Sequence, residues 1–416
     1  MKLKYLYIVV LLCMLVYTSC DDGYKHYDGI YMGSTLGNNP MISVVVDDVF
    51  PKTVELNVAS TKVVDNDVII ELDTDPMAIT AYNEKYGTMY EALPATCFEF
   101  PLKEAVIRKG NYANSDPIEF KITSSNGMVE GTRYMIPVTI RSIKGGSIIE
   151  ASRTLYIALN QIIVGPALRL VGSQYTTTNF SQPGPGVTLP YDVSALTKVT
   201  MEARIFMESQ DGSKLNSIFG LEENFVVRRT AEGGKTGQLE LAGGGISNVL
   251  TSEQFPFNSW KHVAIVYDGD ASGKGKATIY IDGQVSNSMD VQRKGDHRIL
   301  INLHAQYMQA SDHGEGGGAK WVNTAPFWIG KSERARYLHG SVSEAKIWAK
   351  ALTASEVNAN MCVTDPNADM LIAYWRFNDG GADGKTFKDL TGHGFDMKLS
   401  SGTASWTQNV RCPENY

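Results

Sequence analysis

The fold of a large part of this chain is indicated by two segments, Trp260-Lys-His-Val-Ala-Ile-Val-Tyr-Asp-Gly269 and Ala277-Thr-Ile-Tyr-Ile-Asp-Gly283. Val263 to Tyr267 is an apolar run that is too short for a helix and rich in β-branched residues, which is typical of a buried strand. Apolar and polar residues alternate from Ala277 to Asp282, which favours a second strand with one buried face. Gly273-Lys274-Gly275 supplies turn residues between the two. The pattern therefore predicts a β-hairpin.

Later stretches continue this pattern of short strands and turns. They are Phe327-Trp-Ile-Gly330, Leu338 to Trp348, and Leu371 to Asn378 followed by Asp389-Leu-Thr-Gly392. Together with the hairpin they resemble, in family order, the laminin-G or concanavalin-A-like jelly-roll sandwich. The resemblance implies such a sandwich over residues 168–416, and binding is the role that the fold suggests by analogy alone.

Short strands also fill the region before this sandwich. Apolar and polar residues alternate from Val54 to Val58, and again from Val68 to Leu72, Tyr134 to Ile140 and Leu155 to Leu159. Turn-forming residues separate these runs. The spacing predicts an antiparallel sandwich of immunoglobulin-like size over residues 31–163.

A second resemblance concerns this first region. Ala81-Tyr-Asn-Glu84, Gly87-Thr-Met-Tyr90, Ile107-Arg-Lys-Gly110 and Gly131 to Val138 resemble an uncharacterised Ig-like domain. That domain is found at the N-terminus of surface glycan-binding lipoproteins and some endo-glycosidases of gut-type glycan-utilisation systems, where it resembles a spacer. We therefore expect an all-β chain: an immunoglobulin-like sandwich, a linker over Gln161 to Leu170, and a concanavalin-A-like jelly-roll sandwich.

The N-terminus predicts export. Lys2 and Lys4 precede an apolar run from Leu6 to Val16, which is too short to span a bilayer and ends shortly before Cys20. Small residues directly before a cysteine resemble a bacterial lipobox. The resemblance implies a signal peptide over residues 1–19 and lipidation of Cys20, whereas the alternative is an ordinary signal peptide with a chance cysteine.

The lipobox leads to an expected location. Residues 20–30 are polar and predict a tether, and Asp21-Asp22 resembles the surface-export signal of Gram-negative lipoproteins. This implies a lipid-anchored protein of the outer membrane that faces the cell exterior. In other bacteria an Asp at this position retains the protein at the inner membrane, so the leaflet stays open. The net charge of -7 gives no electrostatic case for nucleic-acid binding.

Three cysteines lie beyond the predicted signal peptide and its lipidation site, and they allow at most one disulfide within the chain. Cys97 is expected to be a buried free thiol. Cys362 and Cys412 belong to the second domain in an oxidising compartment, so they form either a disulfide or two independent thiols.

Motifs for catalysis are largely missing from the sequence. It contains no Gly-x-Ser-x-Gly elbow and no His-Glu-x-x-His pair, and its two Gly-Lys-Thr segments lack the first glycine of a phosphate loop. Glycosidases of the sandwich fold carry a Glu-x-Asp-x-x-Glu strand, which is also missing. We expect no enzyme activity, although glycoside hydrolysis stays an alternative.

Calcium is the one cofactor that the laminin-G resemblance allows, and none is required. Laminin-G relatives often hold one calcium ion at the sandwich rim, and Asp389 would contribute to such a site. Asp268 to Gly273 begins like an EF-hand loop, but the twelfth position is Ile279 and the flanks are strands.

The segment from Gln292 to Ala325 is longer than the resemblance allows, and long loops in compact domains are often functional. Sugar rings stack on Trp or Tyr, and sugar hydroxyls bond to polar side chains. The predicted glycan-binding residues are therefore Tyr307, Trp321, His304, His313, Arg336 and Tyr337. The tryptophans of the strand motifs, Trp260, Trp328, Trp348 and Trp375, are expected in the core.

These observations predict a non-catalytic surface lipoprotein that captures an oligosaccharide or the glycan of a glycoprotein. The resemblance of the first domain suggests host-type, mannose-rich N-glycans, a TonB-dependent transporter, and neighbouring glycan-binding proteins as partners. The alternatives are a glycosidase of the same fold and an adhesin that binds a protein.

Overall fold

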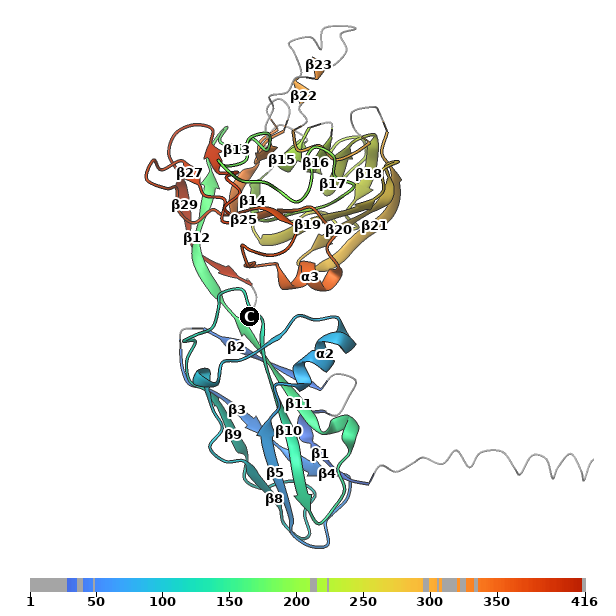
Figure 1. Ribbon diagram of the computed structural model, residues 1–416, viewed down its shortest axis with the longest axis vertical. Helices are drawn as coiled ribbons and strands as arrows, with labels where there is room; N and C mark the ends of the chain where they lie inside the picture. Colours follow the sequence, from blue (N-terminus) through green and yellow to red (C-terminus); the bar gives the residue numbers. More distant parts are fainter. Residues whose placement is uncertain are drawn as a thin grey trace, which may run out of the picture.

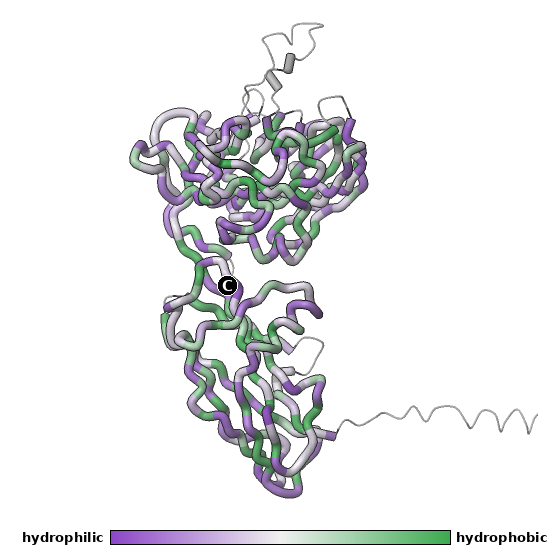
Figure 2. The backbone as a smooth tube through the Cα atoms, in the orientation of Figure 1, coloured by the Kyte–Doolittle hydropathy of each residue, from purple (hydrophilic) through white to green (hydrophobic). Residues whose placement is uncertain are grey.

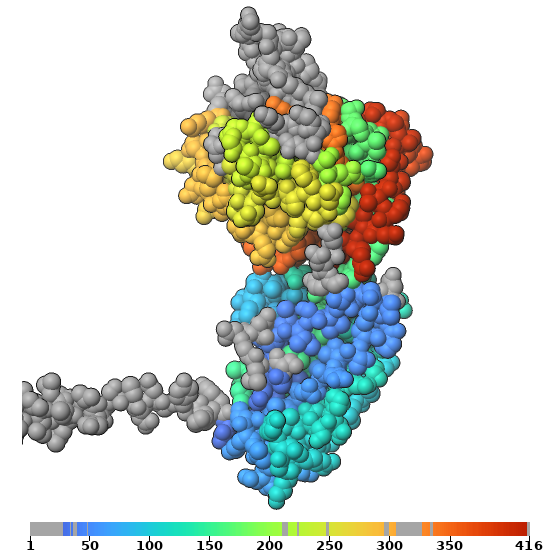
Figure 3. Space-filling view, turned by 180° about the vertical axis from the view of Figure 1, so that it is seen from behind, coloured from blue at the N-terminus to red at the C-terminus, as the bar shows by residue number. Residues whose placement is uncertain are grey.

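The structure is a computed structural model that describes residues 28–35, 40–47, 49–209, 215–222, 224–294, 299–304, 307–308, 320–321, 327–332 and 336–413. These residues form two β-rich units stacked along the long axis of the molecule (Figure 1). Figure 3 shows the same two lobes from behind, joined at a narrower waist. The predicted all-β class is confirmed, because the described helices are few and short.

The first unit consists of two facing sheets and one helix. Its strands and its helix are β1 (Ile30–Met32), β2 (Met41–Val46), β3 (Lys52–Leu56), β4 (Val58–Ser60), β5 (Val68–Thr74), α2 (Ala78–Tyr86), β6 (Glu91–Ala92), β7 (Phe98–Glu99), β8 (Glu104–Ile107), β9 (Ile118–Ile122), β10 (Tyr134–Lys144) and β11 (Thr154–Gln161). One sheet has the order β2-β11-β10-β5-β8 and the other β3-β9-β7, while β1 pairs with β4. Their apolar faces share one core, in which Cys97 is a buried free thiol.

The second unit is a two-layer sandwich. Its strands and its helix are β12 (Ile163–Leu170), β13 (Thr176–Thr178), β14 (Lys198–Ser209), β15 (Leu215–Leu221), β16 (Phe225–Thr230), β17 (Gln238–Gly243), β18 (Ile246–Leu250), β19 (Trp260–Gly269), β20 (Lys274–Ile281), β21 (Gln284–Gln292), β22 (Tyr307–Met308), β23 (Lys320–Trp321), β24 (Phe327–Ile329), β25 (His339–Trp348), α3 (Ala354–Ala359), β26 (Leu371–Arg376), β27 (Thr386–Phe387), β28 (Met397–Leu399) and β29 (Ser405–Cys412).

Two eight-stranded sheets make up this sandwich. The proximal sheet runs β21-β20-β19-β14-β25-β12-β29, with β26 added beside β25, and it faces the first unit (Figure 1). The distal sheet runs β18-β17-β16-β15-β24-β13-β28-β27 and lies on the side away from the first unit. The predicted hairpin forms β19 and β20, with Ile265 paired to Ile279.

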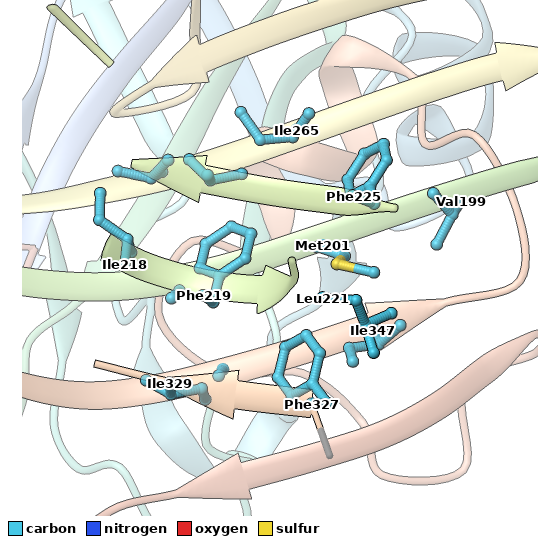
Figure 4. Packing of buried hydrophobic residues seen from close by; sticks show 14 of the residues in the cluster. Val199, Met201, Ile218, Phe219, Leu221, Phe225, Ile265, Phe327, Ile329 and Ile347 are labelled. Carbon is cyan, nitrogen blue, oxygen red and sulfur yellow. The ribbon is translucent and has the colours of Figure 1, made fainter. Parts of the chain in front are cut away.

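Alternating apolar residues of both sheets meet in one core. Figure 4 shows Met201, Ile265 and Ile347 of the proximal sheet facing Phe225 and Phe327 of the distal sheet. In Figure 2, hydrophobic and hydrophilic stretches accordingly interleave along the strands rather than separating into long blocks. Burial of this apolar surface stabilises the sandwich by roughly 25 cal/mol per Å².

The predicted linker over Gln161 to Leu170 is wrong. Ile163–Leu170 is strand β12, which pairs with both β25 and β29, so only Ile162 separates it from β11. Gly165 and Pro166 suggested a linker because proline cannot donate to a β-ladder. Here the ladder shifts register between Gly165 and Ala167, and this irregularity accommodates the proline.

The helix expected after Thr353 forms and covers the outer face of the proximal sheet. Thr353 and Glu356 make the predicted capping box, each side chain accepting from the other residue's backbone N–H. Val357 of α3 packs with Trp348 and Tyr374 in a second apolar cluster on this face. The proximal sheet is therefore covered on both faces.

The waist between the two units is held by specific contacts. The Arg376 guanidinium donates to both oxygens of Glu130 at 2.7 and 3.0 Å, which joins the second unit to the first. Gly131 packs against Val363 without room for a Cβ atom. The disulfide expected between Cys362 and Cys412 is present at this end of the sandwich.

Candidate functional site

Of the predicted glycan-binding residues, the structure describes the side chains of His304, Arg336 and Tyr337. Cys20 and His313 lie outside the described residues. Tyr307 and Trp321 are directly opposite each other in the β22–β23 pair, so the long excursion brings these two positions together. Their side chains lie outside the description.

His304 is tied to the body of the sandwich. Its Nε2 lies 2.9 Å from the carbonyl oxygen of Phe180, and its backbone N–H donates to Asn302. The neighbouring Ile301 and Leu303 are buried in the core, so this part of the excursion is packed structure rather than a free loop. His304 is better explained as a loop anchor than as a ligand contact.

Arg293, at the start of the excursion, is a further anchor that the sequence did not reveal. Its side chain is only 1% exposed, and the guanidinium donates to the carbonyl oxygens of Asn224 and Ile299. These bonds connect the end of β21 to the turn before β16. A buried guanidinium needs such acceptors, because an unsatisfied buried charge is costly.

Asp389 is engaged by the loop in which it lies. Its Oδ1 accepts from the backbone N–H of Tyr374 and from Thr391, and its Oδ2 accepts from the N–H of Phe395. The carboxylate thus organises the turn after β26, which argues against the predicted role as a calcium ligand. Within the described ranges, no three His, Cys, Asp or Glu side chains gather in a way that could hold a metal ion.

Three aromatic side chains do gather on the distal sheet, and we call Tyr175, Trp328 and Tyr337 the aromatic platform. The ring centroids of Tyr175 and Trp328 are 6.4 Å apart at an interplanar angle of 82°, and those of Tyr175 and Tyr337 are 6.5 Å apart at 27°. All three side chains are half-buried, so each exposes part of its ring. Tyr337 is a predicted binding residue, whereas the other two are new.

Strand alternation places Trp328 on this outer face. Phe327 and Ile329 point into the core, so Trp328 between them points the opposite way. Its paired neighbours on adjacent strands are Gly220 and Thr177, which are both small. The expectation of a core Trp328 is therefore wrong, while Trp260, Trp348 and Trp375 are buried as predicted.

Tyr337 reaches the platform because the chain closes a loop after β24. The N–H of Leu338 donates to the carbonyl oxygen of Gly330 at 2.9 Å, which brings both ends of the 331–337 segment together. Gly330 has φ +85, and a Cβ atom there would lie 2.4 Å from the Leu170 side chain. The buried Ser332 hydroxyl accepts from Ser217 and fixes the loop to β15.

Tyr175 is held in place by hydrogen bonds to Ser400, in the segment after β28. It directly precedes β13, and its N–H donates to the Ser400 hydroxyl at 3.1 Å. The N–H of Ser400 in turn donates to the carbonyl oxygen of Tyr175 at 2.9 Å. Backbone bonds on β13, β24 and the 331–337 segment thus bring three aromatic residues from distant parts of the sequence to one place.

Lys331 lies at the centre of the platform. Its Nζ is 4.4 Å from the Tyr175 ring centroid, 5.2 Å from that of Trp328 and 5.8 Å from that of Tyr337. Aromatic faces attract cations at these distances. Burial lowers the pKa of the Lys331 ammonium below its ordinary value, because removal from water disfavours the charged form.

A network of ion pairs borders the platform on the same sheet. Arg336 donates to Glu222 at 3.3 Å, and Arg228 lies 3.8 Å from the same carboxylate. Arg228 also contacts Glu240 at 3.2 Å, and Lys235 pairs with Glu240 as well. Arg336 is thus part of this network, beside the platform that its neighbour Tyr337 helps to build. Each carboxylate contacts two cations, an arrangement unlike the acid and base pair of a glycosidase.

The missed residues left one usable signal in the sequence. In Phe327-Trp328-Ile329, strict alternation puts either the tryptophan or its two neighbours in the core, and two apolar residues outweigh one. Tyr175 and Lys331 gave no comparable signal, because their meeting depends on which strands pair. Among the described residues, no helix is long and apolar enough to cross a membrane.

Comparison with known families supports the two-part organisation. Residues 24–147 match a family model described as an N-terminal domain, and residues 181–298 match Laminin_G_3, described as the concanavalin A-like lectin/glucanases superfamily. Each match covers less than half of the chain. No curated protein is significantly similar to this sequence.

Solved structures share the fold. A Bacteroides ovatus ATCC 8483 protein for which carbohydrate binding has been proposed is 22% identical, with a TM-score of 0.53 over 91% of this chain and 97% of that chain. A SAP-like pentraxin from Limulus polyphemus is 16% identical, with a TM-score of 0.31 over 47% of this chain and 80% of that chain. Bacteroides thetaiotamicron EndoBT-3987, solved with a Man5GlcNAc product, is 16% identical, with a TM-score of 0.27 over 40% of this chain and 36% of that chain. The last two likenesses are too weak to support an argument.

Proposed function

We propose that this chain is a non-catalytic carbohydrate-binding protein whose site is the aromatic platform on the distal sheet. The observation on which the proposal rests is the half-buried cluster of Tyr175, Trp328 and Tyr337 on an outer sheet face. Such rings offer apolar faces to the C–H bonds of a pyranose, while polar side chains at the border bond to hydroxyl groups. Carbohydrate binding proposed for the Bacteroides ovatus protein of similar fold supports the same conclusion.

The position of the platform suits capture of a ligand outside the cell. The distal sheet lies on the side away from the first unit (Figure 1). We propose that Cys20 carries a lipid that anchors the chain at the outer surface of the outer membrane, with the first unit as a spacer. A bound oligosaccharide would then pass to a neighbouring TonB-dependent transporter. Fatty-acid labelling of the wild type and of Cys20→Ala in cells tests the anchor.

A glycan array tests the binding site. The chain from Asp21 onward is compared with its Trp328→Ala variant, which removes the largest ring of the platform. We expect the affinity for the best glycan to fall about tenfold or more, because aromatic anchors dominate such sites. Incubation of the protein with the same glycans, followed by chromatography to detect released sugars, separates binding from hydrolysis.

Two further variants sharpen this test. Tyr112→Ala removes an exposed ring of the first unit, 66% exposed, and should leave the affinity unchanged. Trp321→Ala tests the β22–β23 pair, and we expect it to weaken binding less than Trp328→Ala does. Unchanged binding in Trp328→Ala would move the site away from the platform, and no binding to any glycan would favour a protein partner.

A further inference from the structure

Lys331 differs from three other basic residues of the distal sheet. Arg228, Lys235 and Arg336 each contact the carboxylate of Glu222 or Glu240. In the described part of the chain, no carboxylate pairs with Lys331, which contacts the three platform rings instead. Among the described residues, the charge of this platform cation is therefore met only by aromatic faces.

This arrangement is costly for the free protein. An ammonium is a strongly hydrated point charge, and a half-buried position removes part of its water. The aromatic faces attract the ammonium and offset part of that loss. The lowered pKa of Lys331 indicates that the compensation is incomplete. An anion bound beside the Lys331 ammonium would complete this compensation.

We propose that the platform binds acidic glycans, with the aromatic rings against a pyranose ring and Lys331 against its anionic group. This inference rests on the proposed carbohydrate-binding function and names its substrate class. The anionic group is a carboxylate, as in uronic and sialic acids, or a sulfate. Both are hydrogen-bond acceptors for which an ammonium is a charge-assisted donor.

Sugars with single, well-placed charges fit better than polyanions. The chain has a net charge of -7, so it repels long polyanions from most of its surface. Three other described cations on this sheet, Arg228, Lys235 and Arg336, pair with Glu222 or Glu240, whereas Arg229 is buried over the Phe257 ring and Lys398 of β28 is exposed. Lys331 lies beside three platform rings and has no carboxylate partner among the described residues.

Matched ligands test this inference by titration calorimetry. A glucuronate oligosaccharide is compared with its carboxyl-reduced counterpart, and sulfolactose with lactose. We expect the wild type to prefer the acidic member of at least one pair about tenfold or more, since hydrogen bonds to charged groups are strong. The pair that shows the preference identifies carboxylate or sulfate.

Lys331→Met keeps the length and apolar stem of the side chain and removes its charge. We expect this variant to lose the preference while its affinity for the neutral member stays within about threefold. Lys331→Arg should retain much of the preference. Lys198→Met is the matched control, because it removes a paired cation of the proximal sheet, away from the platform, and should leave the preference intact.

The outcomes separate the two proposals. If neutral and acidic members bind equally, or if Lys331→Met keeps the preference, the acidic class is wrong while carbohydrate binding stands. If neither member of any pair binds and the array is also blank, both proposals fail. Circular dichroism of each variant confirms that it folds.

Discussion

At the scale of single residues, the environment of Lys331 gives the site its character. Three rings within 6 Å of the ammonium fix its position, and burial disfavours its charged form. Asp389 shows the opposite situation, because N–H and O–H donors surround both of its oxygens. The first residue is prepared for an anion, whereas the second is fully used by the fold.

The lowered pKa of Lys331 leads to a prediction about pH. A base whose folded-state pKa is depressed loses its charge at a lower pH than an ordinary lysine, for which the value is 10.5. Preference for an acidic glycan should therefore be complete below the folded-state pKa and begin to fall as the pH rises through it, at a lower pH than for an ordinary lysine. Calorimetry of the glucuronate oligosaccharide at increasing pH measures this. A preference that persists above 10.5 would contradict the role of Lys331.

The same shift affects stability with a defined sign. In the folded state the charged ammonium is disfavoured, so the penalty is fully present below the folded-state pKa. It is relieved as the pH rises from that value towards 10.5. Compared with Lys331→Met, the wild type should gain stability over this range, and denaturant unfolding at several pH values would show the difference.

At the scale of elements, two three-residue strands determine the geometry of the platform. β13 and β24 lie side by side, with Thr177 opposite Trp328. Tyr175 directly precedes β13, and Lys331 follows shortly after β24. These short strands are held in the sheet because the seven-residue strand β15 pairs with β24 and β28 pairs with β13. Trp328 thus lies on a paired strand, while Tyr175, Lys331 and Tyr337 lie in segments that flank these two strands.

The disulfide between Cys362 and Cys412 acts at the same scale. It links the end of β29 to the segment after α3, across a sequence separation of 50. Loop closure of this length stabilises a fold by about 2–4 kcal/mol. We expect the double variant Cys362→Ser, Cys412→Ser to lose about that much free energy of unfolding in the second unit, as measured by urea denaturation.

Reduction provides an independent comparison for this variant. Wild type treated with a reductant should unfold at the same urea concentration as the double variant, and the reductant should not affect the variant itself. Glycan affinity should persist in the folded variant, since the platform lies on the other sheet. Equal stability of oxidised wild type and variant would show that the bridge does not contribute.

At the scale of the whole molecule, the waist sets the orientation of the two units. Arg376 donates to Glu130 across it and also lies 3.4 Å from the buried Glu344, whose pKa is raised by burial. The distal sheet with the platform lies on the far side of the sandwich from this contact (Figure 1). A firm waist would hold the platform away from the surface to which the first unit is attached.

Glu130→Gln tests the firmness of the waist. It removes one charge of the pair while Arg376 keeps Glu344, and the Glu130 side chain is 44% exposed, so the loss of stability should stay below about 1 kcal/mol. We expect a broader distribution of interdomain distances in small-angle scattering, with unchanged glycan affinity. Glu119→Gln breaks an ion pair within the first unit and is the control. Identical scattering of Glu130→Gln and wild type would show that other contacts hold the waist.

Local pattern was sufficient for much of this protein. Alternation and turn residues identified the β19–β20 hairpin and the all-β class, and the capping box identified α3. These features depend on neighbours within a few residues, which is why the sequence determined them. The platform depends on pairing between β13 and β24, which are far apart in the chain, and on a loop closed between Gly330 and Leu338. Alternation can say that Trp328 and its neighbours point to opposite faces, but only tertiary structure decided which face is covered and which residues meet there, because core burial and strand order involve the whole domain.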